Sequence, residues 1–183
     1  YIIMTHGRKH MSRIFLKTGM ISLTIIELPS NYGGVNIMTT NSIETERLLI
    51  RSTREEDGAF CLSMWLDEEM GKYLSDPPRD KADEAELNFA KGIEKQEGWY
   101  PFVAELKSTG ERMATCSFVP GEDGKTWDLG YCVHKNYWRQ GFAAEMIAAL
   151  IQEAYRRGGR SFTAAVAKEN AGSNAVLRKL GFS

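Results

Sequence analysis

The hydrophobic and polar positions between Trp127 and Arg157 change their period once. From Trp127 to Val133, bulky apolar residues alternate with polar or smaller ones, a period of two that predicts a β-strand with two different faces. From Phe142 onward, apolar residues recur every three or four positions, which predicts an amphipathic helix that ends near Gly158. This stretch therefore predicts a strand, a short loop and a long helix.

The loop between this strand and this helix is a candidate anion site. The first turn of a helix carries amide N–H groups without internal partners and a partial positive charge, which together attract phosphate. Gly141 allows a close approach to the backbone, and Arg139 can add a charged contact. The alternative is an ordinary strand-to-helix turn that contains a glycine, and the loop by itself does not decide between the two.

The same two periods predict the remaining elements of the chain. Strands are expected at 48–51, 99–105, 112–119 and 161–167, and helices from 53, from 80 to 96 and from 170 to 181. Thr53 or Ser52 is the expected cap of the first of these helices. The strand at 161–167 should run parallel to the strand at 127–133, because a helix crossover returns the chain in the same direction. The fold class is α/β with a mixed sheet.

Three segments carry a resemblance to a known family. They are Gly130-Tyr131 with Tyr137-Trp138 and Arg139 to Glu145, then Asn170 to Phe182 with its pattern Asn-x-x-Ser-x-x-Val-x-x-Lys-Leu-Gly-Phe, and Thr45 to Arg51. Residues 43–183 resemble the GCN5-related N-acetyltransferases (GNAT), and most of all the RimJ/RimL-like branch that acetylates ribosomal-protein N-termini. The resemblance implies a mostly antiparallel mixed sheet flanked by helices and acetyl-CoA as cosubstrate. Trp138 departs from the wider superfamily but is common in this branch.

The resemblance also implies which residues bind the cofactor. The backbone at Cys132, Val133 and His134 would pair with the pantetheine arm, and the amide of Val133 would hold the thioester oxygen. The complete set of implied cofactor-binding residues is Cys132, Val133, His134, Trp138, Arg139, Gln140, Gly141, Phe142, Ala143, Asn170 and Ser173. Trp65, Tyr73 and Leu74 would line the acceptor site, or else belong to the core.

Catalysis would require a base for the amine and a proton for the leaving thiolate. The resembled family often has an acid just before this Gly-Tyr pair, so the resemblance implies Asp128 as the base, acting through water or with a pKa raised by burial. The alternative is a carboxylate paired with a neighbouring cation. Ser173 is the expected proton donor, although Ser173 and Asn170 are also good helix caps. Cys132 has no His-Asp partners that would make it a nucleophile.

Composition narrows the class of protein. A chain of 183 residues with 43% hydrophobic residues is long enough for one domain with a real core, and its net charge of −1 gives no electrostatic case for nucleic acid or a membrane. The cysteines Cys61, Cys116 and Cys132 show no metal-ligand spacing, so no metal site is expected, and buried reduced thiols in the cytoplasm are favoured. The expected partner is an amine, either a peptide N-terminus or a small molecule, and the expected state is a monomer or homodimer.

The first 37 residues differ from the rest. Their charge is +3 and that of the remainder is −4. They are interpreted as a secretory signal, as an extra strand or arm, or as translated upstream sequence ahead of Met38, and the third interpretation is preferred. The acetyltransferase domain would then be residues 38–183.

The chain stops at Ser183, where relatives in the family usually continue with two further strands. A truncated sheet would leave the strand at 161–167 with an exposed, unpaired edge. The function that the resemblance implies is acetyl transfer to an amine by direct attack. The missing strands favour the alternative, a non-catalytic acyl-CoA-binding module or an inactive truncated fragment.

Overall fold

The computed structural model describes residues 20–25, 42–74, 80–95 and 97–183. Short 3₁₀ turns at 55–57, 93–95 and 135–137 accompany the main elements. These elements, in chain order, are β1 (Met20–Ile25), β2 (Ser42–Glu44), β3 (Leu48–Ser52), α1 (Gly58–Trp65), α2 (Glu84–Lys91), β4 (Tyr100–Leu106), β5 (Arg112–Pro120), β6 (Thr126–Val133), α3 (Phe142–Arg156), β7 (Ser161–Ala167) and α4 (Ala171–Lys179).

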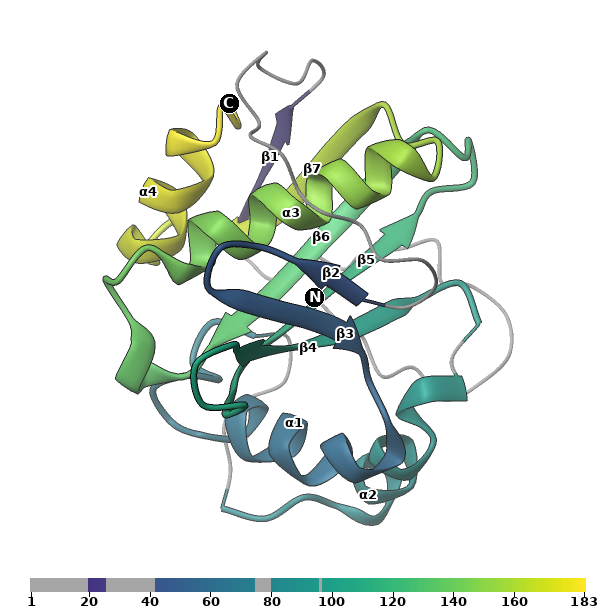
Figure 1. The fold of residues 1–183 in the computed structure, drawn as a ribbon, viewed down its shortest axis with the longest axis vertical. Helices are drawn as coiled ribbons and strands as arrows, with labels where there is room; N and C mark the ends of the chain where they lie inside the picture. The colour runs from purple at the N-terminus through teal and green to yellow at the C-terminus, as the bar shows by residue number, and fades with distance from the viewer. Residues whose placement is uncertain (1–19, 26–41, 75–79, 96) are drawn as a thin grey trace.

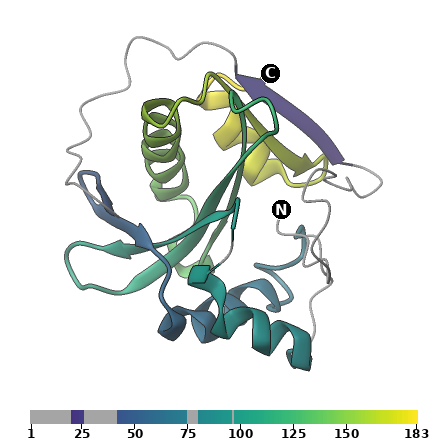
Figure 2. The same cartoon turned by 90° about the vertical axis from the view of Figure 1, so that its right-hand side faces the viewer.

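Within these described ranges, seven strands form one sheet in the order β1-β7-β6-β5-β4-β3-β2. Every neighbouring pair is antiparallel except β6 and β7, which are parallel, as the crossover through α3 requires. Helices α3 and α4 lie on one face of the sheet, whereas α1 and α2 lie on the other (Figures 1 and 2). The prediction of a mixed, mostly antiparallel α/β fold is confirmed.

The main core lies between the sheet and α3. The predicted apolar stripe of this helix is buried, with Met146, Ile147 and Leu150 at most 1% exposed. They pack against inward-facing residues of β6 and β7, such as Leu129 and Phe162. Each side chain of this size contributes roughly 1.5–3 kcal/mol when it is fully buried, so this contact fixes the position of α3 over the two parallel strands.

Two predicted helix boundaries were wrong. The helix expected from 80 to 96 is limited to α2, because Asp83 caps it at Glu86 and Gly92 ends it before a separate 3₁₀ turn. Neither Thr53 nor Ser52 caps the turn before α1. The Thr53 amide donates instead to the Pro101 carbonyl (3.1 Å), extending the ladder between β3 and β4.

The expectation that β7 would have an unpaired edge was also wrong, because β1 pairs with that edge. Met20 to Ile25 pair antiparallel with Ala167 to Phe162, and Leu23 and Ile25 are buried in the main core. Thr24 exchanges two backbone hydrogen bonds with Ser183 at the end of the chain. Residues 20–25 thus form an extra strand, while the rest of the first 37 residues lies outside the described part of the chain.

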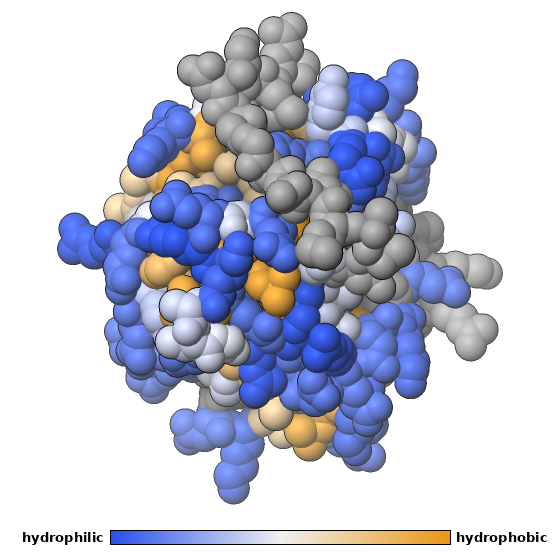
Figure 3. Space-filling model, in the orientation of Figure 1, coloured by the Kyte–Doolittle hydropathy of each residue, from blue (hydrophilic) through white to orange (hydrophobic). Residues whose placement is uncertain are grey.

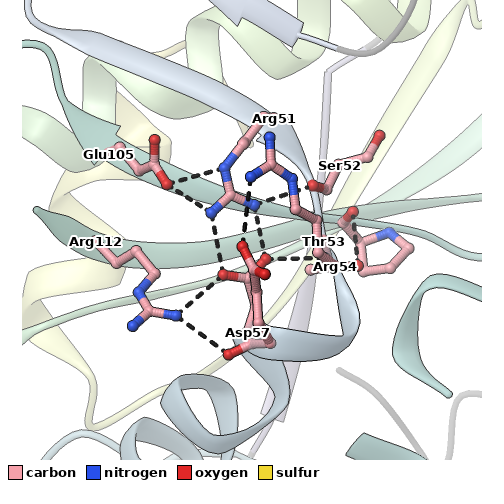
Figure 4. Close-up of polar contacts among 9 residues, drawn as sticks. Arg51, Ser52, Thr53, Arg54, Asp57, Glu105 and Arg112 are labelled. Atoms are coloured by element: carbon pink, nitrogen blue, oxygen red, sulfur yellow. Dashed lines mark hydrogen bonds and ion pairs between the residues drawn. The ribbon is translucent and has the colours of Figure 1, made fainter. Parts of the chain in front are cut away.

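A buried ion cluster joins the sheet to α1. The carboxylate of Asp57, which is 0% exposed, receives two hydrogen bonds from Arg51 (2.6 and 3.0 Å) and one from Arg112 (3.2 Å). Arg51 also donates to Glu105, and the Arg54 amide donates to Asp57 at 2.8 Å (Figure 4). Burial by itself would raise the pKa of Asp57, but these hydrogen bonds outweigh it and lower the pKa below its ordinary value.

Candidate active site

Strands β6 and β7 pair along only part of their length. Their register joins Thr126 with Ser161, Trp127 with Phe162 and Asp128 with Thr163, and it ends there. Beyond Asp128, β6 continues to Val133 along β5, while β7 continues along β1. The two strands therefore separate into a V-shaped opening, which we call the β6–β7 opening.

The backbone of β6 presents hydrogen-bonding groups to this opening. The His134 amide donates to Met113 of β5 (2.9 Å), so the alternation of an antiparallel ladder directs the Val133 and Tyr131 amides away from β5. The Val133 carbonyl already accepts a hydrogen bond from the Trp138 indole at 2.6 Å. An extended molecule in the opening would find the remaining groups of this edge in the arrangement of a strand partner.

The loop before α3 follows directly from this edge. Arg139 and Gly141 both have positive φ values, 62° and 83°, which turn the loop back onto the start of the helix. Among the described residues, no acceptor lies within hydrogen-bonding distance of the amides at 139–144. The N-terminus of a 15-residue helix therefore presents a row of unpaired donors with a partial positive charge, suited to a diphosphate.

A clamp from the β2–β3 turn holds the first turn of α3. Glu145 accepts hydrogen bonds from the Thr45 hydroxyl (2.5 Å), the Arg47 amide (2.9 Å) and the Arg47 side chain (2.7 Å). The Arg47 guanidinium also lies over the Phe142 ring at 4.0 Å and donates to the Gln140 carbonyl at 3.0 Å. Because Glu145 is engaged, it does not compete with an anion for the free amides.

Sequence reasoning had assigned Arg47 only to an opening strand. Its contacts lie 93 to 98 positions away in the chain, so no local pattern could show them.

Asp128 lies where β6 and β7 separate. The hydroxyl of Thr163, its cross-strand neighbour, donates to Asp128 Oδ1 at 2.7 Å. Burial raises the pKa of Asp128 above its ordinary value, and the Thr163 hydrogen bond opposes the rise. Asp128 has no cation partner among the described side chains, which removes the ion-pair interpretation for that part of the chain. Its role as a base stays a prediction.

Ser173 and Asn170 occupy different positions at the start of α4. The Asn170 side chain accepts from the Ser173 amide (3.1 Å), so Asn170 is the helix cap and the Ser173 hydroxyl is not. That hydroxyl lies near Tyr131 of β6. Burial raises the pKa of Tyr131 to about 12, and Ser173 opposes the rise. The Tyr131 hydroxyl is buried and has no hydrogen-bond partner within bonding distance in the described part of the chain, and the sequence pattern gave Tyr131 no role.

Cys132 and His134 have structural surroundings. The Cys132 thiol contacts the Met70 carbonyl at 3.7 Å, and burial raises its pKa to about 12, which makes it a poor nucleophile. His134 Nδ1 accepts from the Asn136 amide and caps the 3₁₀ turn at 135–137. Any cofactor contact made by these two residues is therefore expected from their backbone.

A cavity of about 60 Å³ lies between the sheet and the α1–α2 region. Gly130, Tyr131 and Cys132 of β6 form part of its wall. Of the predicted lining residues, Trp65 and Leu74 line it, and Tyr73 instead directs its hydroxyl toward the Glu169 carbonyl (3.5 Å). Asp128 and Ser173 are not in the wall. The other lining residues are Thr53, Cys61, Leu62, Leu66, Glu86, Ile93, Trp99, Pro101, Phe102, Thr115, Cys116 and Ser117.

Charge is distributed unevenly around this cavity. Residues 55–97, which include α1 and α2, hold 13 acidic and 5 basic residues, a charge of −8. Since the whole chain carries −1, the remainder carries +7. The acidic segment that walls the cavity thus favours cations.

The described residues contain neither a candidate membrane-spanning helix nor a candidate metal centre. No described helix is long and apolar enough to cross a bilayer, and no three His, Cys, Asp or Glu side chains in the described segments are grouped to hold a metal ion. The face shown in Figure 3 is largely hydrophilic, with hydrophobic residues in small separate patches.

Comparison with known sequences gives one family match and related proteins. The family described as the acetyltransferase (GNAT) domain matches residues 47–183. An uncharacterized N-acetyltransferase of Bacillus licheniformis, p20, is 28% identical over 146 residues, which are 77% of this chain and 82% of that protein.

Solved structures share the fold. Spermidine N-acetyltransferase from Vibrio cholerae, in complex with CoA and spermine, has a TM-score of 0.66 at 17% identity, covering 76% of this chain and 82% of that one. The ribosomal L7/L12 alpha-N-protein acetyltransferase RimL, in complex with coenzyme A, has a TM-score of 0.64 at 20% identity, covering 76% and 81%. The fold is thus shared with two proteins whose solved structures contain coenzyme A.

Proposed function

The chain belongs to the GNAT acetyltransferase family, and we propose that it transfers acetyl directly from acetyl-CoA to a protein N-terminal α-amine or a small-molecule amine. It is an N-acetyltransferase with acetyl-CoA as cosubstrate. We further propose that it belongs to the RimJ/RimL-like branch and acts in the bacterial cytoplasm, which is supported by the RimL fold match and the Bacillus relatives.

The row of unpaired amides at 139–144 carries this proposal. These donors, together with the Arg139 side chain, would hold the diphosphate of coenzyme A, while the β6 edge from Tyr131 to Val133 would pair with its pantetheine arm. Acetyl-CoA supplies the activated acyl group as a thioester. The Val133 amide, which faces the β6–β7 opening, would donate to the thioester oxygen and stabilise charge that develops there.

Proton transfer is assigned to two side chains near the opening. Asp128 would accept the proton of the attacking amine through a water molecule, because it does not line the cavity itself. Its raised pKa makes it a stronger base than a solvated aspartate. Ser173 would return a proton to the thiolate from the opposite side of the opening, where its hydroxyl lies near Tyr131.

The two reactants are expected to approach from different sides. Coenzyme A is an anion and suits the α3 N-terminus, whereas an amine is a cation in solution and suits the acidic 55–97 segment. The cavity between that segment and β6 would hold the acceptor. An α-amine, with a pKa near 8, loses its proton at neutral pH much more easily than a lysine side chain, with a pKa near 10.4.

The test is thiol release from acetyl-CoA with and without a panel of peptides, polyamines and aminoglycosides. We expect release that depends on the amine, together with micromolar or tighter binding of CoA measured by calorimetry. Tight binding of CoA without release for any amine would favour an acyl-CoA-binding module. Failure to bind CoA at all would overturn the proposal.

A further inference from the structure

Two tryptophans line the cavity, and their indole N–H groups differ. Trp65 Nε1 donates to the Thr115 hydroxyl at 3.1 Å. Trp99 Nε1 has no acceptor within bonding distance among the residues that the structure describes, although Trp99 is only 6% exposed. Both tryptophans belong to the wall of the same cavity.

The unpaired N–H of Trp99 calls for an explanation. Buried polar groups in folded proteins almost always have a partner, and leaving one without costs about 1–3 kcal/mol. An indole nitrogen only donates, so it can be satisfied solely by an acceptor atom. A phenylalanine would fill much of the same space without this cost.

The position of Trp99 is well fixed. The Phe89 ring of α2 stacks on it with a centroid distance of 5.6 Å, and Trp99 leads directly into β4. Its neighbours in the cavity wall include Ile93 and Pro101, which offer apolar surface beside it. A donor on a side chain held in this way, in the wall of a mostly apolar cavity, would orient an acceptor oxygen.

We propose that the Trp99 indole N–H is a specificity-determining donor that binds an oxygen of the amine acceptor. Amines that carry a carbonyl or similar oxygen close to the reacting nitrogen are then preferred over amines that carry none, such as polyamines. This inference rests on the proposed function, because it places the acceptor in this cavity. The acidic charge of the 55–97 segment attracts both classes of amine and does not recognise an oxygen, so a preference for oxygen-bearing amines requires a hydrogen-bond donor in the cavity wall, the role we give to Trp99.

Two small amines test the proposal: glycinamide, which carries a carbonyl, and ethylenediamine, in which a methylene replaces that carbonyl and the amide nitrogen becomes a second amine. The measured quantity is the ratio of their kcat/KM values, because this ratio cancels effects on CoA binding and on folding. In the Trp99→Phe variant we expect the ratio of glycinamide to ethylenediamine to fall by roughly 5- to 10-fold, the loss of one hydrogen bond. In Trp65→Phe we expect the ratio to stay constant.

Thermal unfolding and an isosteric variant check the physical basis. Trp65→Phe leaves the Thr115 hydroxyl without its donor and should lower Tm, whereas Trp99→Phe removes an unpaired donor and should lower it less. Replacing Trp99 by 3-benzothienylalanine, which keeps the ring shape without the N–H, should reproduce the loss of the ratio. An unchanged ratio in both Trp99 variants, or an equal fall in Trp65→Phe, would overturn the inference. Absence of thiol release with every amine in the unmodified protein would instead refute the proposed function.

Discussion

The Asp57 cluster and the loop before α3 both combine arginine side chains with the start of a helix. Only the Asp57 cluster has its polar groups saturated with hydrogen bonds. Around Asp57, the carboxylate oxygens accept from two arginine side chains and a backbone amide (Figure 4). At the loop, the amides from 139 to 144 have no acceptor among the described residues. A saturated polar network stabilises the fold, whereas a preformed but unsaturated one is available to a ligand.

The largest expected effect is the loss of stability when the hydrogen-bonded Asp57 cluster is broken. Asp57→Ala leaves Arg51 buried without its main partner, so the free energy of unfolding should fall by about 3–5 kcal/mol. Urea denaturation measures this change. Glu56→Ala, which removes an exposed ion pair with Arg54 at 3.4 Å, should change stability by less than about 0.5 kcal/mol. Equal losses in the two variants would contradict a structural role for the cluster.

Asp128 lies between these extremes, since it has one hydrogen bond and no cation partner among the described residues. Asp128→Asn keeps that hydrogen bond but removes the base, and we expect kcat to fall about 10²- to 10⁴-fold with CoA affinity unchanged. Thr163→Val removes the hydrogen bond that holds the pKa of Asp128 down. The acid limb of its pH–rate profile should therefore move to higher pH, and an unmoved limb would exclude Asp128 as the titrating base.

Stability should respond to pH with opposite signs at the two aspartates. The pKa of Asp57 is lowered by folding, so its contribution is complete above the ordinary value near 4 and is lost as pH falls below it. The pKa of Asp128 is raised, so the folded state keeps a proton that the unfolded state releases, and stability falls as pH rises above the ordinary value. Asp128→Asn should abolish this second trend in denaturation measured from pH 3 to 7.

Local patterns predicted the elements that carry the site but not the contacts between them. The alternation at 127–133 and the stripe from Phe142 define β6 and α3, because one buried face imposes each period. The pairing of Thr163 with Asp128 and of Arg47 with Glu145 joins residues 35 and 98 positions apart, and no periodicity encodes such contacts. The strand β1 was missed as the cover of β7 because a short apolar run carries no information about which edge it will join.

A smaller effect is expected from Gly141 in the unsaturated loop. Its φ of 83° favours glycine, so Gly141→Ala should cost about 1–2 kcal/mol locally and distort the loop, lowering CoA affinity roughly 10-fold or more. Gly124 has a similar φ of 63° in a turn with open space around it, and Gly124→Ala provides a matched control with the same strain. Calorimetric titration of CoA should separate the two. Equal affinity in both variants would contradict a phosphate-binding role for the loop.

The smallest effect concerns Arg139, where stability and binding should change in opposite directions. Arg139 is exposed and has a φ of 62°, a conformation that costs a non-glycine residue about 1–2 kcal/mol. Arg139→Gly removes this strain and should raise Tm slightly, but it also removes a cation and should weaken CoA binding by a few-fold, less so at high salt. Arg139→Lys keeps both the charge and the strain, so its Tm and its salt dependence should match those of the unmodified protein. A glycine variant that bound CoA as well as the lysine variant at low salt would show that the loop binds through its backbone alone, and the contrast with the arginine-saturated Asp57 cluster would then rest entirely on the free amides.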